Sequence, residues 1–164
     1  MRILKKRRQK GKTNYKKRLA LLKGKSPRIV LRKTNRYLIA QYVSSQKAQD
    51  KIEFGFNSKD LVKFGWPKEF KGSLKSTPAA YLIGLLTGKK ILKLKKNTPI
   101  VDFGMIRNLH KSKIYAFVKG LVDLGIKIKY DEKIFPEENR IKGKHLKKDF
   151  SEQFNKIKSE IESK

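Results

Sequence analysis

The sequence contains no cysteine, and its only two histidines, His110 and His145, stand far apart in a chain of 164 residues. Without thiols there is no disulfide framework, no cysteine zinc site and no thiol nucleophile. Two separate imidazoles also leave little from which to build a tetrahedral metal site. We therefore expect no metal ion, cofactor or disulfide, and the lack of cysteine suits a reducing compartment.

Long hydrophobic runs are missing as well. The longest, AAYLIGLL at residues 79–86, is far shorter than the ~20 residues that a membrane-spanning helix needs. The first ten residues, MRILKKRRQK, carry charge before any apolar run begins. These features predict a soluble intracellular protein with no membrane partner. A hydrophobic fraction of 38% supports one modest core, so we expect one domain with tails.

Acidic residues are scarce and unevenly placed. The chain has only 14 Asp and Glu against 43 Lys and Arg, and its first 49 residues contain seventeen basic residues and no acidic one. A net charge of +29 strains a compact fold unless a polyanion neutralises it, and nucleic acid is the commonest polyanion to do so. A membrane surface is the less favoured alternative, because residues 5–12 have no apolar side.

Hydrophobic patterning divides the chain into a basic N-terminal arm (residues 1–25), a core (26–130) and a polar tail (131–164). Residues 1–12 have no apolar period and are expected to be disordered in the free protein, whereas YKKRLALLK at 15–23 predicts a short helix that Gly24 ends. Three segments rich in Val, Ile, Tyr and Phe then predict an antiparallel meander with one solvent-facing side: RIVLRKT, YLIAQYVSSQ and KIEFGFNS. In the third, Ile52, Phe54 and Phe56 are expected to share a face.

The rest of the core predicts helices packed on a sheet. Ser58 is expected to cap a brief helix at 59–64, which is followed by a loop at 67–76. Thr77 is expected to cap a buried helix that begins at Pro78 and reaches about Leu92. The segments TPIVDFG and IKIKY predict two strands, and the helical pattern between them suggests a βαβ-type crossover. We therefore predict an α/β fold with a mixed sheet. Phe150, Phe154, Ile157 and Ile161 mark a C-terminal helix.

Catalytic and nucleotide-binding patterns are weak. GLLTGKK at 84–90 has three residues between its glycines instead of the four of a phosphate-binding loop, and a second lysine replaces the required hydroxyl. A metal-dependent nuclease would need several carboxylates at Asp102, and only Asp50, Glu53 and Asp60 are candidates to join it. We expect no enzyme and no small-molecule substrate; a nuclease that uses Asp102 is the alternative.

Basic stretches that also contain polar and aromatic residues are better candidates for a site. In KTNYKKR and RKTNRY, cations alternate with Asn, Thr and Tyr, which offer phosphate contacts, hydrogen bonds to sugars and bases, and a stacking face. MIRNLHKSK at 105–113 joins the end of a predicted strand to a helix, a common place for ligands in α/β sheets. The residues there that are expected to bind RNA backbone are Arg107, Asn108, His110, Lys111 and Lys113, with a ligand-free basic loop as the alternative.

Five segments, in order between Gly11 and Leu146, carry a resemblance to a known family: GKTNYKKRLALLKGKSPRIVLRKTNRYLIAQ, LVKFGW, STPAAYLIGLLTGKK, VDFGMIR and FPEENRIKGKHL. They are similar to the archaeal and eukaryotic branch of universal large-subunit ribosomal protein eighteen, the 5S rRNA binder. The resemblance implies a mixed-sheet domain of the translational-machinery type. It also implies a structural role in the large ribosomal subunit, in the cytoplasm, where the family helps to attach 5S rRNA to the large rRNA at the central protuberance beside neighbouring ribosomal proteins.

Matching motifs imply the RNA-contacting residues. They are Lys12, Thr13, Asn14, Tyr15 and Arg18 in the arm, Arg28, Arg32, Lys33, Asn35 and Arg36 in the first hairpin, Arg107 with its basic neighbours in a second region, and Arg140, Lys142 and Lys144 in the tail. The extension after Leu146 departs from the family pattern, and we expect it to form a solvated surface helix, with a specific contact to an unassigned partner as the alternative. A general RNA chaperone or nucleic-acid packaging protein is the alternative function, since it would share the charge but not a preference for 5S rRNA.

Overall fold

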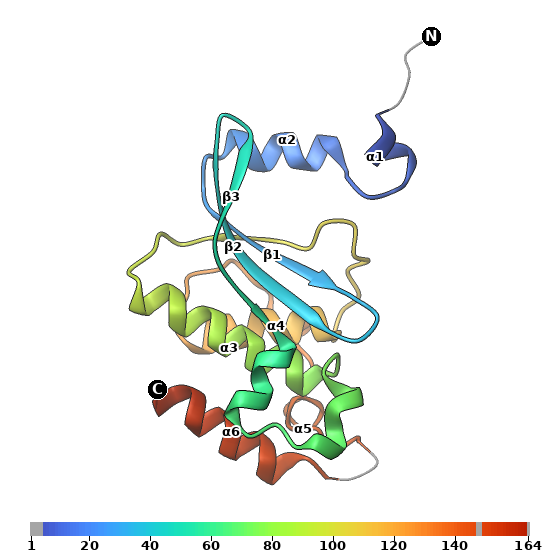
Figure 1. Ribbon diagram of the computed structural model, residues 1–164, viewed down its shortest axis with the longest axis vertical. Helices are drawn as coiled ribbons and strands as arrows, with labels where there is room; N and C mark the ends of the chain where they lie inside the picture. The colour runs from blue at the N-terminus through green and yellow to red at the C-terminus, as the bar shows by residue number, and fades with distance from the viewer. Residues whose placement is uncertain (1–4, 147–148, 164) are drawn as a thin grey trace.

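The structure is a computed structural model that describes residues 5–146 and 149–163 (Figure 1). The N-terminal arm lies at one end of the molecule and the C-terminal helix at the other, with the sheet and the central helices between them. The elements, in chain order, are α1 (Lys6–Gln9), α2 (Tyr15–Lys23), β1 (Arg28–Lys33), β2 (Leu38–Gln46), β3 (Gln49–Asn57), the 3-10 helices η1 (Ser58–Phe64) and η2 (Lys68–Ser73), α3 (Thr77–Lys93), β4 (Ile100–Asp102), α4 (Lys113–Asp123), the 3-10 helix η3 (Glu132–Ile134), α5 (Glu138–Lys142) and α6 (Ser151–Ser163).

The four strands form a mixed sheet in the order β3-β2-β1-β4. β1, β2 and β3 are antiparallel neighbours, which confirms the predicted meander, and β4 pairs in parallel with β1. The prediction of an α/β fold with a mixed sheet and helices packed on it is thus confirmed.

The prediction of a strand at residues 126–130 is wrong. That segment has no regular secondary structure, so the connection between the parallel strands β1 and β4 runs through β2, β3 and α3 instead of through α4. Ile126 is buried and Ile128 packs against the core, whereas Lys127 and Lys129 are exposed. The alternation of apolar and charged residues in this segment therefore reflects burial of one side of an extended chain that does not pair with another strand.

A β-bulge alters the face of β3. The register shifts between Tyr42 and Val43 of β2, which pair with Phe54 and Ile52. Phe54 stacks on Tyr42 at 5.1 Å between ring centroids, but Ile52 is 55% exposed. The expectation that Ile52 shares a face with Phe54 is wrong, because the extra residue between them at the bulge places their side chains on opposite faces of the strand.

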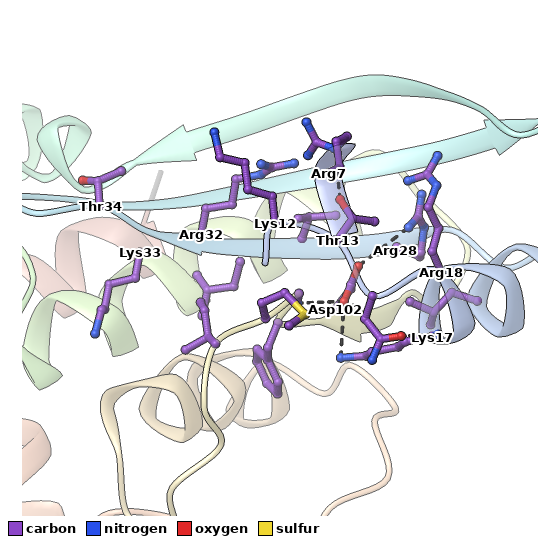
Figure 2. Close-up of a pocket in the computed structure, with 18 residues that line it drawn as sticks. Arg7, Lys12, Thr13, Lys17, Arg18, Arg28, Arg32, Lys33, Thr34 and Asp102 are labelled. Atoms are coloured by element: carbon purple, nitrogen blue, oxygen red, sulfur yellow. Dashed lines mark hydrogen bonds and ion pairs between the residues drawn. The ribbon is translucent and has the colours of Figure 1, made fainter. Parts of the chain in front are cut away.

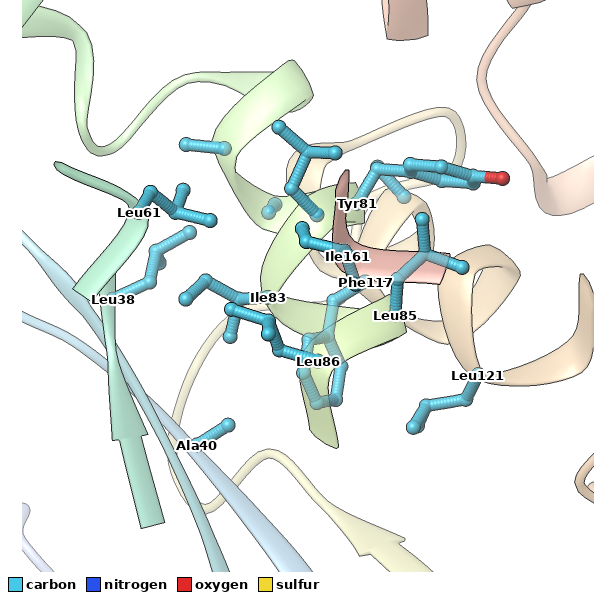
Figure 3. Close-up of a cluster of buried hydrophobic side chains, with 14 of the residues drawn as sticks. Leu38, Ala40, Leu61, Tyr81, Ile83, Leu85, Leu86, Phe117, Leu121 and Ile161 are labelled. Atoms are coloured by element: carbon cyan, nitrogen blue, oxygen red, sulfur yellow. The ribbon is translucent and has the colours of Figure 1, made fainter. Parts of the chain in front are cut away.

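The central helix α3 begins as the sequence predicts, with the cap one residue earlier. The hydroxyl of Ser76 accepts a hydrogen bond from the Ala79 N–H (3.4 Å), and Pro78 stands in the first turn. Residues 77–88 are all buried. Figure 3 shows their side chains meeting those of β2 and α4 in one core. No helix among the described residues is long and apolar enough to cross a membrane.

Three short segments differ from the expectations. The helix at 58–64 forms as a 3-10 helix, but Asn57 caps it, while the hydroxyl of Ser58 accepts a bond from the Leu38 N–H (3.1 Å). A single helical turn, α1, forms where no regular structure is expected, and residues 1–4 of that prediction lie outside the described residues. The expected loop at 67–76 contains the 3-10 helix η2.

The C-terminal helix α6 belongs to the core, so the expectation of a solvated surface helix is wrong. Phe154, Ile157 and Ile161 on its inner face are at most 3% exposed, as is Phe150 just before it. Phe150 packs on Trp66, with 4.6 Å between ring centroids, and Phe154 packs on Tyr81 at 5.5 Å. At the far end, Nζ of Lys89 donates to the carbonyls of residues 161 and 162. The helix packs against α3, η1 and α5, at the end of the molecule opposite the arm (Figure 1).

Candidate nucleic-acid interface

A basic cleft of about 520 Å³ opens between the N-terminal arm, strand β1 and the loop after β4 (Figure 2). It brings together two groups of residues that the sequence predicts separately, one on the arm and one on the first hairpin. The lining comprises Arg7, Lys12, Thr13, Asn14, Lys17, Arg18 and Leu21 from the arm, Arg28 and residues 30–34 from β1 and the turn after it, and residues 102–106.

The arm has local structure of its own. The side chain of Asn14 caps α2 by accepting a hydrogen bond from the Lys17 N–H (3.1 Å), which the TNYKK sequence favours. Nε of Arg7 donates to the hydroxyl of Thr13 at 3.0 Å, and the ammonium of Lys5 lies over the ring of Tyr15 at 4.8 Å. These contacts fold α1 back onto the start of α2.

Charge holds α2 against the body of the protein. None of its residues is buried, and Leu19 is 56% exposed. Arg18 pairs with Asp50 at the tip of the β2–β3 hairpin (2.8 Å), and Lys17 pairs with Asp102 at the end of β4 (3.5 Å). The arm is therefore docked by ion pairs and not by an apolar seam.

Arg28 lies beneath this contact and ties both carboxylates together. Its side chain is 3% exposed; its guanidinium pairs with Asp50 at 2.7 Å and with Asp102 at 3.7 Å, and it donates to the hydroxyl of Ser45 at 3.0 Å. The structure thus places this predicted RNA-contacting residue where it orients the acids that bind the arm. A planar fork with several donors suits this bridging position better than a lysine would.

The carboxylate of Asp50 is kept ionised by its neighbours. Partial burial alone would raise its pKa, but hydrogen bonds from Arg18 and Ser45, with the charges of Arg28 and Arg18, outweigh that effect and lower the pKa below its usual value. A depressed pKa in the folded state stabilises docking above the ordinary carboxylate pKa, and the contribution is lost as the pH falls through the depressed value. Docking of α2 should therefore hold at pH 7 and weaken below about pH 4.

We expect Asp50→Asn to loosen α2 at neutral pH without unfolding the core, because it removes the carboxylate that holds Arg18. Hydrogen exchange of the α2 amides, followed by mass spectrometry, should speed up several-fold, while exchange in α3 stays unchanged. Glu53→Gln is the matched control, since Glu53 forms an equally short ion pair with Lys96 (2.7 Å) away from the arm. If the α2 amides of the two variants exchanged at the same rate, the Arg18–Asp50 ion pair would not be what holds α2 in place.

Several cations of the cleft and its rim have no acidic partner. Among the described residues, no carboxylate pairs with Lys12, Arg32, Lys33 or Arg36, and all four side chains are exposed. Asn35 stands beside them in the turn after β1. These groups are free to bind an anionic ligand.

The other predicted site residues lie outside the cleft. Arg107, His110 and Lys111 are exposed on the loop before α4, where Lys111 pairs with Glu137 at 3.4 Å. Lys113 starts α4 and is half-buried, Arg140 and Lys142 lie on α5, and Lys144 follows it. Sequence reasoning missed Arg7, Lys17 and Lys75; the first two stand within basic runs, whereas nothing near Lys75 marks it.

The carboxylates that the nuclease alternative requires are already engaged by cations or by a backbone N–H. Asp50 and Asp102 are both held by Arg28, Glu53 pairs with Lys96, and Asp60 accepts from the Asn57 N–H in the cap of η1. Within residues 5–146 and 149–163 there is no group of three or more His, Cys, Asp or Glu that would hold a metal ion. The segment 84–90 lies inside the buried helix α3, so it forms no phosphate-binding loop.

Comparison with known proteins identifies the family. The family model described as "Ribosomal large subunit proteins 60S L5, and 50S L18" matches residues 1–101. Large ribosomal subunit protein uL18 of Korarchaeum cryptofilum is 42% identical over 140 residues, which cover 85% of this chain and 70% of the relative. The proteins of the same name from Methanoregula boonei and Methanospirillum hungatei are 40% and 39% identical over 140 residues, 85% of this chain and 78% of each relative. These matches confirm the resemblance seen in the sequence motifs, and the chain belongs to the family of ribosomal large subunit proteins 60S L5 and 50S L18.

Proposed function

We propose that the protein is a structural constituent of the large ribosomal subunit that binds 5S rRNA and helps to attach it to the large rRNA at the central protuberance. The observation that carries this proposal is the basic cleft, where the arm and β1 converge and where four cations without an acidic partner among residues 5–146 and 149–163 line or border the opening. Family membership supports the assembly in which this cleft works.

The chemistry of the cleft suits a folded RNA. Lys12, Arg32, Lys33 and Arg36 supply charges for backbone phosphates, and Thr13 adds a hydroxyl. Phosphate contacts of this kind release condensed counterions, so binding should weaken steeply with salt. In this proposal Arg28 and Arg18 position the cleft wall, because their charges are already engaged by acids.

In this function the groups of the cleft bind and orient RNA without a catalytic residue, metal or cofactor. The remaining predicted contacts, on the loop before α4 and on α5, would meet RNA beyond the cleft. A contact with the large rRNA there would let one protein join the two RNA molecules.

Removal of residues 1–25 tests the proposal. Because the arm has no buried residue among those described, the core should stay folded, while the dissociation constant for 5S rRNA should rise at least tenfold in filter binding at moderate salt. A double variant of the full chain, Lys12→Gln with Arg32→Gln, should weaken binding in the same direction. Its matched control is Lys63→Gln with Lys156→Gln, which removes the same charge from exposed positions on η1 and α6 that do not line the cleft.

Competition separates this function from that of a general RNA chaperone or packaging protein. The full chain should prefer 5S rRNA to an equal mass of transfer RNA or duplex DNA. Unchanged binding after removal of the arm would refute the cleft as the site, and equal competition by all three nucleic acids would favour the packaging alternative.

A further inference from the structure

Four cations from four segments gather beside the first turn of α4, at the end of β1 away from Arg28. They are Lys33 at the end of β1, Lys75 in the loop before α3, Lys113 at the start of α4 and Arg140 on α5. Far apart in sequence, these segments carry no common motif, so the cluster exists only in the folded chain.

Backbone carbonyls hold this cluster in place. Nζ of Lys113 donates to the carbonyl of Lys75 at 2.9 Å, and Nζ of Lys75 donates to the carbonyl of Asn35 at 2.7 Å. The two lysines thereby tie the turn after β1, the loop before α3 and the start of α4 into one unit. Because the acceptors are neutral, the positive charges remain uncompensated.

The cluster is electrostatically costly for the free protein. Burial lowers the pKa of Lys113, and the positive charges of Lys33, Lys75 and Arg140 lower it further. No carboxylate in the described part of the chain forms an ion pair with any of the four. This differs from the arm contact, where Lys17, Arg18 and Arg28 all face Asp50 or Asp102.

Helix α4 adds to the positive potential. The side chain of its cap residue, Ser112, makes no cap hydrogen bond, and no acid stands in the first turn. The first N–H groups of a helix lack partners within the helix and attract anions. The cations and the helix end therefore favour the same kind of ligand.

We propose that Lys33, Lys75, Lys113 and Arg140 form a second anion site, separate from the arm, that takes a phosphate group of the RNA backbone. The inference rests on the proposed function and deepens it. Lys33 also lines the cleft, so one polyanion can pass along the length of β1 from the arm to this cluster. Lysine ammoniums supply point charges and Arg140 a two-pronged donor, a combination that binds phosphate without reading bases.

This site gives the body of the protein a hold on RNA that does not depend on the arm. Such a hold fixes orientation, because a ligand bound at both ends of β1 cannot pivot about either one. A free carboxylate or a lipid phosphate would satisfy the charge alone, but neither would extend into the cleft.

The test uses the full chain with Arg140→Gln and with Lys75→Gln plus Arg140→Gln. Arg140 is exposed and has no acidic partner among the described residues, so its substitution leaves the fold intact, which a thermal melt followed by circular dichroism verifies. The slope of log binding constant against log salt for 5S rRNA should become shallower by about one for the single and about two for the double variant. Lys63→Gln with Lys156→Gln, the charge-matched control, should keep the slope of the unsubstituted protein.

Lysine acylation with and without 5S rRNA gives a readout independent of substitution. RNA should protect Lys75 and Lys113 at least threefold, and leave Lys63 and Lys156 as reactive as before. Unchanged salt slopes with no protection of Lys75 and Lys113 would overturn the second site. If the variant with Lys12→Gln and Arg32→Gln still lost binding in that case, the proposed function would stand without it; if that variant also bound normally, both proposals would fail.

Discussion

Phe154→Ala should destabilise the protein by about 3–5 kcal/mol, the usual cost of removing a fully buried phenyl ring. Phe154 is 3% exposed and packs on Tyr81, and it lies on α6 beyond the part of the chain that the family motifs cover. Urea unfolding, followed by the fluorescence of the sole tryptophan, Trp66, measures the loss. Because Trp66 contacts Phe150 next to α6, its signal reports directly on this part of the core.

Asn155→Ala is the matched control for this prediction. Asn155 follows Phe154 in the same helix but is exposed, and alanine is a better helix former than asparagine. The control should therefore change stability by no more than a few tenths of a kcal/mol. Similar unfolding midpoints for the two variants would mean that α6 does not belong to the core.

Gly120→Ala should cost about 3 kcal/mol, at the upper end for overpacking, even though alanine favours a helix more than glycine does. A Cβ atom at Gly120 would lie 2.4 Å from the carbonyl oxygen of Tyr81, and one at Gly84 would lie 2.3 Å from that of Phe117. Both clashes are with backbone, so helices α3 and α4 would have to move apart. The free energy of unfolding, measured by denaturant titration, should fall for either substitution.

Gly88→Ala separates this packing effect from helix propensity. A Cβ atom there meets the end of the flexible Leu124 side chain at 3.0 Å, and that end can shift. The gain in helix propensity should offset the local adjustment, so we expect stability close to that of the unsubstituted protein. A loss as large as that of Gly120→Ala would show that the two helices are not held together by the Gly84 and Gly120 contact in particular.

Much of the fold could be predicted because local signals decide it. Asn14 caps α2, Pro78 stands in the first turn of α3, and the three apolar segments form the meander. The errors arise where a distant partner decides the outcome. The apolar stripe of α6 is visible in the sequence, but Trp66 and Tyr81, which cover it, lie more than seventy residues earlier.

The sequence predicted the residues of the candidate site as two separate segments, and it did not predict that they meet in one cleft. KTNYKKR and RKTNRY both carry the right chemistry, and the structure brings Lys12, Thr13 and Arg32 from them to the same opening. The role of Arg28 could not be predicted, because its acids come from another hairpin and from β4. Lys75 was missed for the same reason, since only folding places it beside Lys113.

The ion pairs that hold α2 against Asp50 and Asp102 also bear on the energetics of the proposed binding to RNA. A disordered basic tail loses conformational entropy when it binds, and this loss lowers the affinity. Here α2 is already ordered and oriented by Asp50 and Asp102, so much of its conformational freedom is lost when the protein folds and not when RNA binds. Because Lys17 and Arg18 stay paired with these carboxylates, the RNA of the proposed function would meet a helix that is already in place and not a loose tail.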